Sequence, residues 1–311
     1  MSSDITENSN DSITASATVD SSVDSETAEP ESIIPGALYL VATPIGNLGD
    51  ITRRAVEVLK QADFIAAEDT RHSQRLLSNL GINTRLQACH EHNEDRIAPK
   101  LLDEMHAGKA VALISDAGTP LISDPGYRLV TLAHDRGIKV VPIPGACAAI
   151  AALSVSGLAT DAFCFEGFPP AKQGARLNYF KQFVDTTKTM IFYISCHRLL
   201  ETLKDLQTIF GGDRRVSFAR EITKTFETIR RSSLSELIDW VEADDNQRRG
   251  EIVLLVEGNR DDASSSSDID HQLSVLLSEL PLKQAVNLVV KLTGAHKNDV
   301  YKRALELKEL S

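Results

Sequence analysis

Residues 114–126 read Ile-Ser-Asp-Ala-Gly-Thr-Pro-Leu-Ile-Ser-Asp-Pro-Gly, and this stretch decides the fold class. It follows the apolar residues 110–113, which are bounded like a buried strand. Two Gly, two Pro and two Asp within the stretch exclude a regular helix or strand and leave backbone N–H and C=O groups exposed. A strand–helix connection usually takes about two to six residues. Since ligands bind at the carboxyl ends of strands in open α/β sheets, we predict a binding loop here rather than an ordinary connection.

A helical pattern resumes behind this loop. Asp124 is the expected N-cap and Pro125 the expected first helical residue, with Leu129, Val130 and Leu132 on the apolar face. Over the first half of the chain, expected strands alternate with helices, which is typical of a mainly parallel sheet covered on both faces. These strands are expected at residues 37–42, 63–67, 86–90, 110–113 and 139–143.

A second unit begins after a pause in the pattern at residues 157–160. Its expected strands include two that are nearly consecutive, 215–220 and 224–231, so we predict an antiparallel or mixed sheet. The Ser-, Thr- and acid-rich start cannot bury enough apolar surface to become ordered, and four consecutive serines indicate a linker. The predicted organisation is a disordered acidic tail (1–34), an α/β domain (35–157), a second α/β domain (158–258), a linker (259–270) and a helical module (271–311).

The composition, 42% hydrophobic and 25% charged residues, is ordinary for a globular protein. We expect neither a membrane span nor a secretory signal, because no apolar run is long enough and no basic-then-apolar segment begins the chain. The cysteines are widely spaced and form no C-x-x-C, so we expect reduced thiols in a cytoplasmic protein and no metal site. They are Cys89, Cys147, Cys164 and Cys196.

The formal net charge of −11 is concentrated at the start of the chain. Residues 1–32 hold eight acids and no Lys or Arg, which leaves 36 acids against 33 bases in the remainder. The acidic total therefore does not exclude a polyanionic partner, for which local clusters of Lys and Arg matter more.

The first expected strand runs into Thr-Pro-Ile-Gly-Asn-Leu-Gly-Asp at residues 43–50, a turn where backbone amides can meet a cofactor. This turn is not G-x-G-x-x-G, so it gives only weak support for a dinucleotide site. The chain holds no G-x-x-x-x-G-K-[ST], which excludes a P-loop nucleotidase.

Seven segments form a specific combination: LYLVATPIGNLGD (38–50), AEDTR (67–71), SDAGTPLISDPG (115–126), PIPGACAA (142–149), FEGFP (165–169), SCHR (195–198) and AREITK (219–224). Together they resemble the tetrapyrrole-methylase superfamily of S-adenosylmethionine-dependent methyltransferases. Within it, the chain is similar to the branch that methylates the ribose 2′-oxygen of a cytidine in 16S ribosomal RNA, in the decoding region of the small subunit. The resemblance covers residues 37–258.

The resemblance implies the two-domain α/β fold of class III methyltransferases, with the methyl donor in the cleft between the domains, and a small C-terminal helical module. It also implies S-adenosylmethionine as cofactor, the small ribosomal subunit and its 16S rRNA as partner, no membrane partner, and a homodimer. The donor contacts that the resemblance implies are Pro44, Thr119, Pro120, Leu121, Ile122, Cys147, Ala148 and Ile194. We add Gly118 to this set, because a residue without a side chain lets the backbone approach a ligand closely.

A ribose hydroxyl is a poor nucleophile at neutral pH, so a base or an orienting acceptor is expected. With the family in view, Glu68 or Asp69 is expected to orient the hydroxyl and Arg71 to hold phosphate; the alternative is a solvated turn. Arg220 and Glu221 form an analogous pair, for which an internal salt bridge is the alternative. Our predicted catalytic residues are thus Glu68, Asp69, Arg71 and Glu221, and the predicted substrate contacts are Arg71, Arg198 and Arg220.

Two other functions remain open at this point. One is a methyltransferase for a corrinoid or sirohaem precursor, although those enzymes have a more glycine-rich first loop than residues 43–50. The other is a non-enzymatic RNA-binding factor for ribosome assembly, which would not bind the methyl donor.

Overall fold

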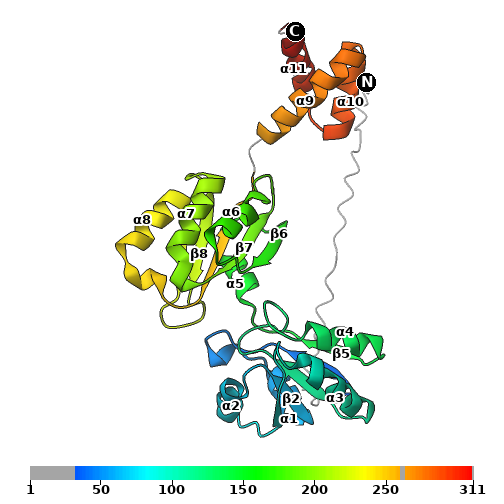
Figure 1. The fold of residues 1–311 in the computed structure, drawn as a ribbon, viewed down its shortest axis with the longest axis vertical. Helices are drawn as coiled ribbons and strands as arrows, with labels where there is room; N and C mark the ends of the chain where they lie inside the picture. The colour runs from blue at the N-terminus through cyan, green and yellow to red at the C-terminus, as the bar shows by residue number, and fades with distance from the viewer. Residues whose placement is uncertain (1–31, 260–262, 310–311) are drawn as a thin grey trace, which may run out of the picture. The chain divides into compact units, whose positions relative to one another are not determined.

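The computed structural model describes residues 32–259 and 263–309 (Figure 1). The first sheet has five strands in the order β3-β2-β4-β1-β5, and every neighbouring pair is parallel. The mainly parallel sheet predicted from the sequence is therefore confirmed. Its strands are β1 (Leu38–Val41), β2 (Phe64–Ala67), β3 (Arg85–Ala88), β4 (Val111–Ile114) and β5 (Val140–Ile143).

Helices cover both faces of this sheet. Successive side chains of a strand point to opposite faces, so one strand contributes to two core clusters. In β1, Tyr39 and Val41 belong to one core cluster and Leu38 to another on the opposite face. The loops that follow β1, β4 and β5 leave from the carboxyl ends of adjacent strands, where ligands bind in such sheets. The helices are α1 (Arg53–Gln61) and α2 (Thr70–Asn79) on one face, and α3 (Glu94–His106) and α4 (Tyr127–Asp135) on the other.

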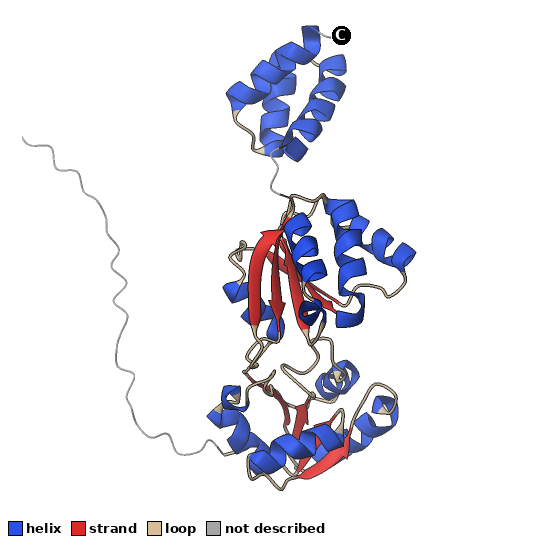
Figure 2. Cartoon of the chain, turned by 90° about the vertical axis from the view of Figure 1, so that its left-hand side faces the viewer, coloured by secondary structure: helices blue, strands red, loops and turns tan. Residues whose placement is uncertain are grey.

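The second sheet is mixed, as the sequence predicts. Its order is β6-β7-β10-β8-β9; β6 and β7 are parallel, and the remaining pairs are antiparallel. Figure 2 shows helices packed along the strands. The strands are β6 (Phe163–Gly167), β7 (Thr189–Ile194), β8 (Arg215–Arg220), β9 (Thr228–Ser233) and β10 (Ile252–Val256). Three helices share the main core cluster with this sheet: α6 (Gln173–Lys181), α7 (Leu199–Phe210) and α8 (Leu234–Ala243).

The helix α5 (Ala148–Val155) covers the other face of the second sheet. Its residues Ala149 and Ala152 form a core cluster with Ile191 and Val253. α5 lies within the range predicted as the first domain, residues 35–157, but it packs on the second sheet. The small side chains of α5 allow it to pack closely on this sheet. Sequence periodicity alone could not show which sheet α5 contacts.

The strand predicted over residues 224–231 begins later, at Thr228. Glu221 and Thr223 have φ values of 51° and 68°, in the left-handed region that side chains other than glycine rarely adopt. These two residues turn the chain out of β8, so residues 221–227 form a loop at the carboxyl end of that strand.

Three C-terminal helices share a small core of their own: α9 (Ala263–Glu279), α10 (Leu282–Thr293) and α11 (Lys297–Glu309). The predicted helical module is present, but α9 already begins inside the range predicted as a linker, 259–270. Ile269 and Leu273 are buried against α10 and α11. Tertiary packing thus outweighs the poor helix propensity of the serine-rich sequence.

The predicted disordered tail, residues 1–34, lies outside the described residues except for its last three. Ile33 and Ile34 pack against the first core, and the backbone N–H of Ile34 donates to the hydroxyl of Tyr39 at 2.7 Å. Ile33 and Ile34 thus have core contacts, although the predicted tail includes them. Over residues 32–259 and 263–309, no helix is both long enough and apolar enough to cross a membrane.

Candidate active site

A cavity of about 390 Å³ lies where the loops at the carboxyl ends of the first sheet meet the ends of β7 and β10. Ile45, from the loop after β1, and Gly118 and Ile122, from the loop after β4, line one part of it. Tyr193 of β7 and Val253 of β10 line another part. The volume falls in the range of small-molecule sites, about 300–1,000 Å³.

Most of the predicted donor contacts meet at this cavity. Gly118, Thr119, Ile122, Cys147, Ala148 and Ile194 line it. Pro44, Pro120 and Leu121 do not line it, although each is next in sequence to a residue that does.

Hydrogen bonds join the three central loops beside the cavity. The backbones of Thr43 and Gly118 exchange two hydrogen bonds, of 2.9 and 3.1 Å, as an isolated bridge. The Thr43 hydroxyl donates to Ser115 O at 3.3 Å, and the Thr119 hydroxyl donates to Ala146 O at 3.0 Å. These bonds fix the loop backbone against the cavity, so a ligand would meet a preformed wall.

The backbone of the loop after β4 is strained just before Asp124. Leu121 and Ser123 have φ values of 72° and 66°, which are costly for residues other than glycine and persist where the surroundings enforce them. Gly126 has a φ of 121°, and a Cβ there would lie 2.7 Å from Leu113 Cδ2. Such outliers cluster at ligand sites.

The N-cap predicted at Asp124 is wrong. α4 begins at Tyr127, and its N-cap is Gly126, which makes no side-chain cap. The left-handed turn at Ser123 and the positive φ of Gly126 delay the start of the helix. The Asp124 side chain is therefore free of capping and lines the cavity.

Asp124 stands among other acids. Burial raises the pKa of Asp124 above its usual range; a hydrogen bond from Ser115 opposes this, and the charge of Asp116 adds to it. Burial likewise raises the pKa of Glu68, and so do the charges of Asp116 and Asp124. Glu68 after β2 and Asp124 after β4 thus hold protons more strongly than exposed carboxyl groups do.

Asp69 has a structural role. Its carboxylate is the N-cap of α2 and accepts from the backbone N–H groups of Arg71 at 2.7 Å and His72 at 3.3 Å. These bonds lower the pKa of Asp69. Arg71 is exposed in the first turn of α2, and neither Glu68, Asp69 nor Arg71 lines the cavity.

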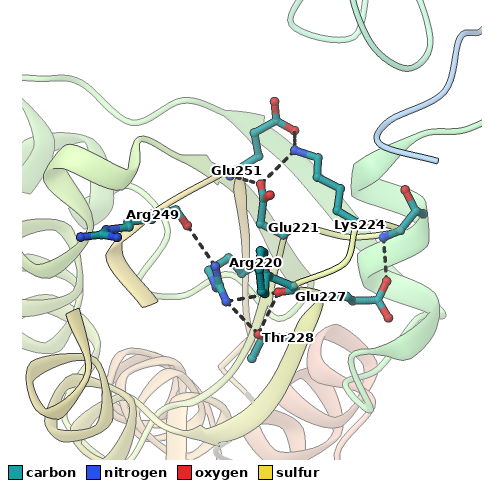
Figure 3. A network of polar contacts seen from close by, with 9 residues as sticks. Arg220, Glu221, Lys224, Glu227, Thr228, Arg249 and Glu251 are labelled. Atoms are coloured by element: carbon teal, nitrogen blue, oxygen red, sulfur yellow. Dashed lines mark hydrogen bonds and ion pairs between the residues drawn. The ribbon is translucent and has the colours of Figure 1, made fainter. Parts of the chain in front are cut away.

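A network of charged groups borders the cavity at the start of β10 (Figure 3). Lys224 Nζ lies 2.9 Å from Glu221 Oε1 and 3.0 Å from Glu251 Oε2, and Glu251 lines the cavity. Burial acts to raise the pKa of Glu221, but hydrogen bonds from Lys224 and from Glu251 N outweigh it and lower that pKa. Glu221 is thus an ion-paired carboxylate that anchors the loop 221–227.

The partner of Glu221 is Lys224, so the internal salt bridge considered between Arg220 and Glu221 is not the one that forms. Arg220 is buried and donates to Gln247 Oε1 at 3.1 Å and to Phe226 O at 3.2 Å. It also donates to Thr228 Oγ1 at 3.2 Å (Figure 3). Its donors are occupied within the second domain, which gives it a positioning role for the loop. The remaining predicted contact, Arg198, ends a short 3-10 helix, Cys196–Arg198, whose first residue lines the cavity.

Sequence reasoning missed several cavity residues. Phe168 and Cys196 lie within recognised segments, so their motifs could have indicated them. Glu251 and Ile252 carry no motif; the antiparallel pairing of β10 with β7 brings Ile252 opposite Ile194 and so to the cavity. Only the tertiary structure reveals that pairing.

Two family models match the chain. The model for tetrapyrrole (corrin/porphyrin) methylases matches residues 37–238, and the model for the RsmI C-terminal HTH domain matches residues 263–308. Among curated proteins, "Ribosomal RNA small subunit methyltransferase I" of Escherichia coli O157:H7 is 52% identical over 272 residues, covering 87% of this chain and 95% of that protein. The protein with the same name from Pseudomonas aeruginosa is 52% identical over 274 residues, covering 87% of this chain and 97% of the relative.

Solved structures with a similar fold include a cobalt precorrin-4 methyltransferase of cobalamin biosynthesis, with a TM-score of 0.53 and 19% identity, covering 71% of this chain and 95% of that one. Diphthine synthase is similar with a TM-score of 0.54 and 13% identity, covering 71% and 90% of the two chains. At such low identity these likenesses concern the fold alone.

Proposed function

Because this chain belongs to the tetrapyrrole methylase family, and within it to the group of proteins named ribosomal RNA small subunit methyltransferase I, we propose that it transfers a methyl group from S-adenosylmethionine to ribosomal RNA. In finer detail, we propose that the acceptor is the ribose 2′-oxygen of a cytidine in 16S rRNA of the small subunit, in the decoding region. The observation that carries the proposal is the cavity, which six of the nine predicted donor contacts line.

The residues of the cavity fit such a donor. Ile45, Ile122, Ile252 and Val253 supply apolar walls, and the backbone around Gly118 can approach a ligand closely. The edge residue Glu251 is a carboxylate that can face a cationic group. When bound, S-adenosylmethionine supplies a methyl group on a positively charged sulfur. Apolar walls favour loss of that charge in the transition state, and a fixed binding loop supplies positioning, which can account for about 7–11 kcal/mol of a barrier.

Donor binding separates this proposal from an RNA-binding assembly factor. Isothermal calorimetry of the full chain with S-adenosylmethionine is expected to show one site per chain. A chain that binds small-subunit RNA without binding the donor would be an assembly factor. Transfer of label from methyl-tritiated donor to a corrin precursor, but not to small subunits, would instead establish the tetrapyrrole alternative.

Two of the thiols report on occupation of the cavity. Cys147 and Cys196 line it, whereas burial raises the pKa of both Cys89 and Cys164 to about 11, so these two stay protonated at pH 8. N-Ethylmaleimide is expected to label Cys147 and Cys196 first, and saturating S-adenosylmethionine to slow that labelling at least about fivefold. Peptide mass spectrometry measures each site. Equal labelling with and without the donor would place the donor elsewhere.

Arg71 is expected to contact RNA phosphate, because it is exposed at the start of α2, just after the carboxyl end of β2. Arg71→Ala should weaken RNA binding and reduce the slope of log affinity against log salt by about one, with donor affinity unchanged. Arg136→Ala, which removes an exposed partner of Asp103, is the control. Equal salt slopes for both variants would remove Arg71 from the RNA surface.

We propose that the protein works as a homodimer in the cytoplasm. Analytical ultracentrifugation of the full chain measures the oligomeric state directly, and a monomer at micromolar concentration would overturn the dimer.

A further inference from the structure

Two carboxylate side chains line the cavity, and they differ in their partners. Glu251 is largely exposed and is ion-paired with Lys224. Asp124 is partly buried, and within the part of the chain that the structure describes no Lys, Arg or His is ion-paired with it. The group that acts to lower the pKa of Asp124 is the neutral hydroxyl of Ser115, not a cation. Asp124 is thus the carboxylate of the cavity that is free to accept a proton.

The groups around Asp124 come from three elements. Asp116 and Ser115 lie on the same loop after β4 as Asp124, and Glu68 follows β2. Tyr193 belongs to β7, and its phenol interacts electrostatically with Asp124. The pKa of Tyr193 is raised to about 12, first by burial, so its phenol is neutral at physiological pH. The neighbours of Asp124 are therefore acidic or neutral, and they favour uptake of a proton by its carboxylate.

The backbone holds Asp124 in place. The left-handed residues Leu121 and Ser123 precede it, and the close approach of Gly126 to Leu113 follows it. This conformation gives up the helix cap that an Asp at this position would ordinarily form. The helix thus lacks the stabilisation of a side-chain cap, and the Asp124 carboxylate lies on the cavity wall instead.

We propose that Asp124 is the general base that accepts the proton of the acceptor hydroxyl. This inference rests on the proposed ribose methylation. In the step, the ribose O–H bond breaks and its proton passes to a carboxylate oxygen of Asp124. The ribose oxygen forms a bond to the methyl carbon, the methyl–sulfur bond breaks, and its electron pair remains on the sulfur, which becomes neutral. Asp124 then releases the proton to water.

The assignment moves the base from the residues that the sequence favours. The carboxylate of Asp69 is occupied as the cap of α2 and has a lowered pKa, which makes it a weak acceptor. Glu68 has a raised pKa but does not line the cavity. Asp124 combines a place on the cavity wall with a raised pKa, and a base is most effective when its pKa approaches the working pH.

The test compares the full chain with Asp124→Asn and with the control Asp135→Asn, an exposed acid at the end of α4. The acceptor is small ribosomal subunits from a strain that lacks this gene, and single-turnover rates are measured at saturating donor from pH 5 to 9. Asp124→Asn is expected to lower the rate by about 10²–10⁴-fold and to abolish the rise of rate with pH that the wild type shows through the pKa of Asp124. Asp135→Asn should match the wild type.

Two readouts do not depend on activity. Donor affinity measured by calorimetry should change by less than about threefold in Asp124→Asn. The folded-state pKa of Asp124 is raised, so its charge destabilises the fold above that pKa, and the penalty disappears as the pH falls through the ordinary carboxyl range. The Asn variant should therefore melt at or above the wild-type temperature at pH 8, with a smaller difference at pH 4.

A rate of Asp124→Asn within tenfold of wild type, or a loss explained wholly by weaker donor binding, would overturn the assignment of Asp124. Failure of the wild-type protein to methylate the subunits at all would instead overturn the proposed function. Both results are read from the same set of reactions.

Discussion

Replacing Asp205 with alanine is expected to lower the free energy of unfolding by about 3–5 kcal/mol. Asp205 and Arg176 are 4% and 1% exposed, and Arg176 Nε donates to Asp205 Oδ2 at 2.7 Å. Gln173 also donates to Asp205, at 3.0 Å. The substitution leaves the buried guanidinium with only the exposed carboxylate of Glu201, 3.7 Å from Arg176 Nη2, as a countercharge. Loss of the buried partner therefore costs far more than the pair contributes. Urea unfolding followed by circular dichroism measures the change.

The exposed pair of Asp103 and Arg136 provides the matched control. Asp103→Ala should cost less than about 1 kcal/mol. The double variant Asp205→Leu with Arg176→Met removes both charges from the core and should recover most of the lost stability. Equal costs for Asp205→Ala and Asp103→Ala would show that the buried pair is not what joins α6 to α7.

Replacing Gly118 with valine is expected to weaken S-adenosylmethionine binding by more than about tenfold, or 1.4 kcal/mol. Gly118 has a φ of 88°, which a β-branched residue tolerates poorly, and its Cβ would lie 3.3 Å from Ile45 Cγ2. Both Gly118 and Ile45 line the cavity, so the new side chain must displace one wall of the donor site. Calorimetry measures the affinity, and circular dichroism confirms that unfolding stays cooperative.

Gly174 offers the control, because it lies in α6 and a Cβ there would meet nothing within 4 Å. Gly174→Val should leave donor affinity unchanged. Wild-type affinity in Gly118→Val would remove the loop after β4 from the donor site.

The first domain could be predicted from its sequence because its signals are local. Each parallel strand is a short apolar run that ends in turn residues, and the expected β4 at residues 110–113 is observed at Val111–Ile114. The packing of α5 was not predictable in this way, because a helix of small apolar residues has no face that indicates its partner. Its contact with the second sheet depends on residues such as Val253, about a hundred positions further along the chain.

The candidate site, too, could be predicted only in part from its sequence. Turn residues around Gly118 indicated a binding loop, and six predicted donor contacts line the cavity. Asp124 was interpreted as a helix cap because Asp-Pro before an apolar pattern is a strong capping signal. Backbone strain at Ser123 overrides that signal. Local rules fail here where a functional residue departs from the locally preferred conformation.

The position of the methyl group on its acceptor is the most direct test of ribose methylation by this chain. Small subunits from the deletion strain are incubated with the purified full chain and methyl-labelled S-adenosylmethionine, and the 16S rRNA is digested to nucleosides for mass spectrometry. We expect label in 2′-O-methylcytidine, at one position per subunit. Label on a base, on another nucleoside, or on no RNA while a tetrapyrrole precursor is methylated, would contradict it.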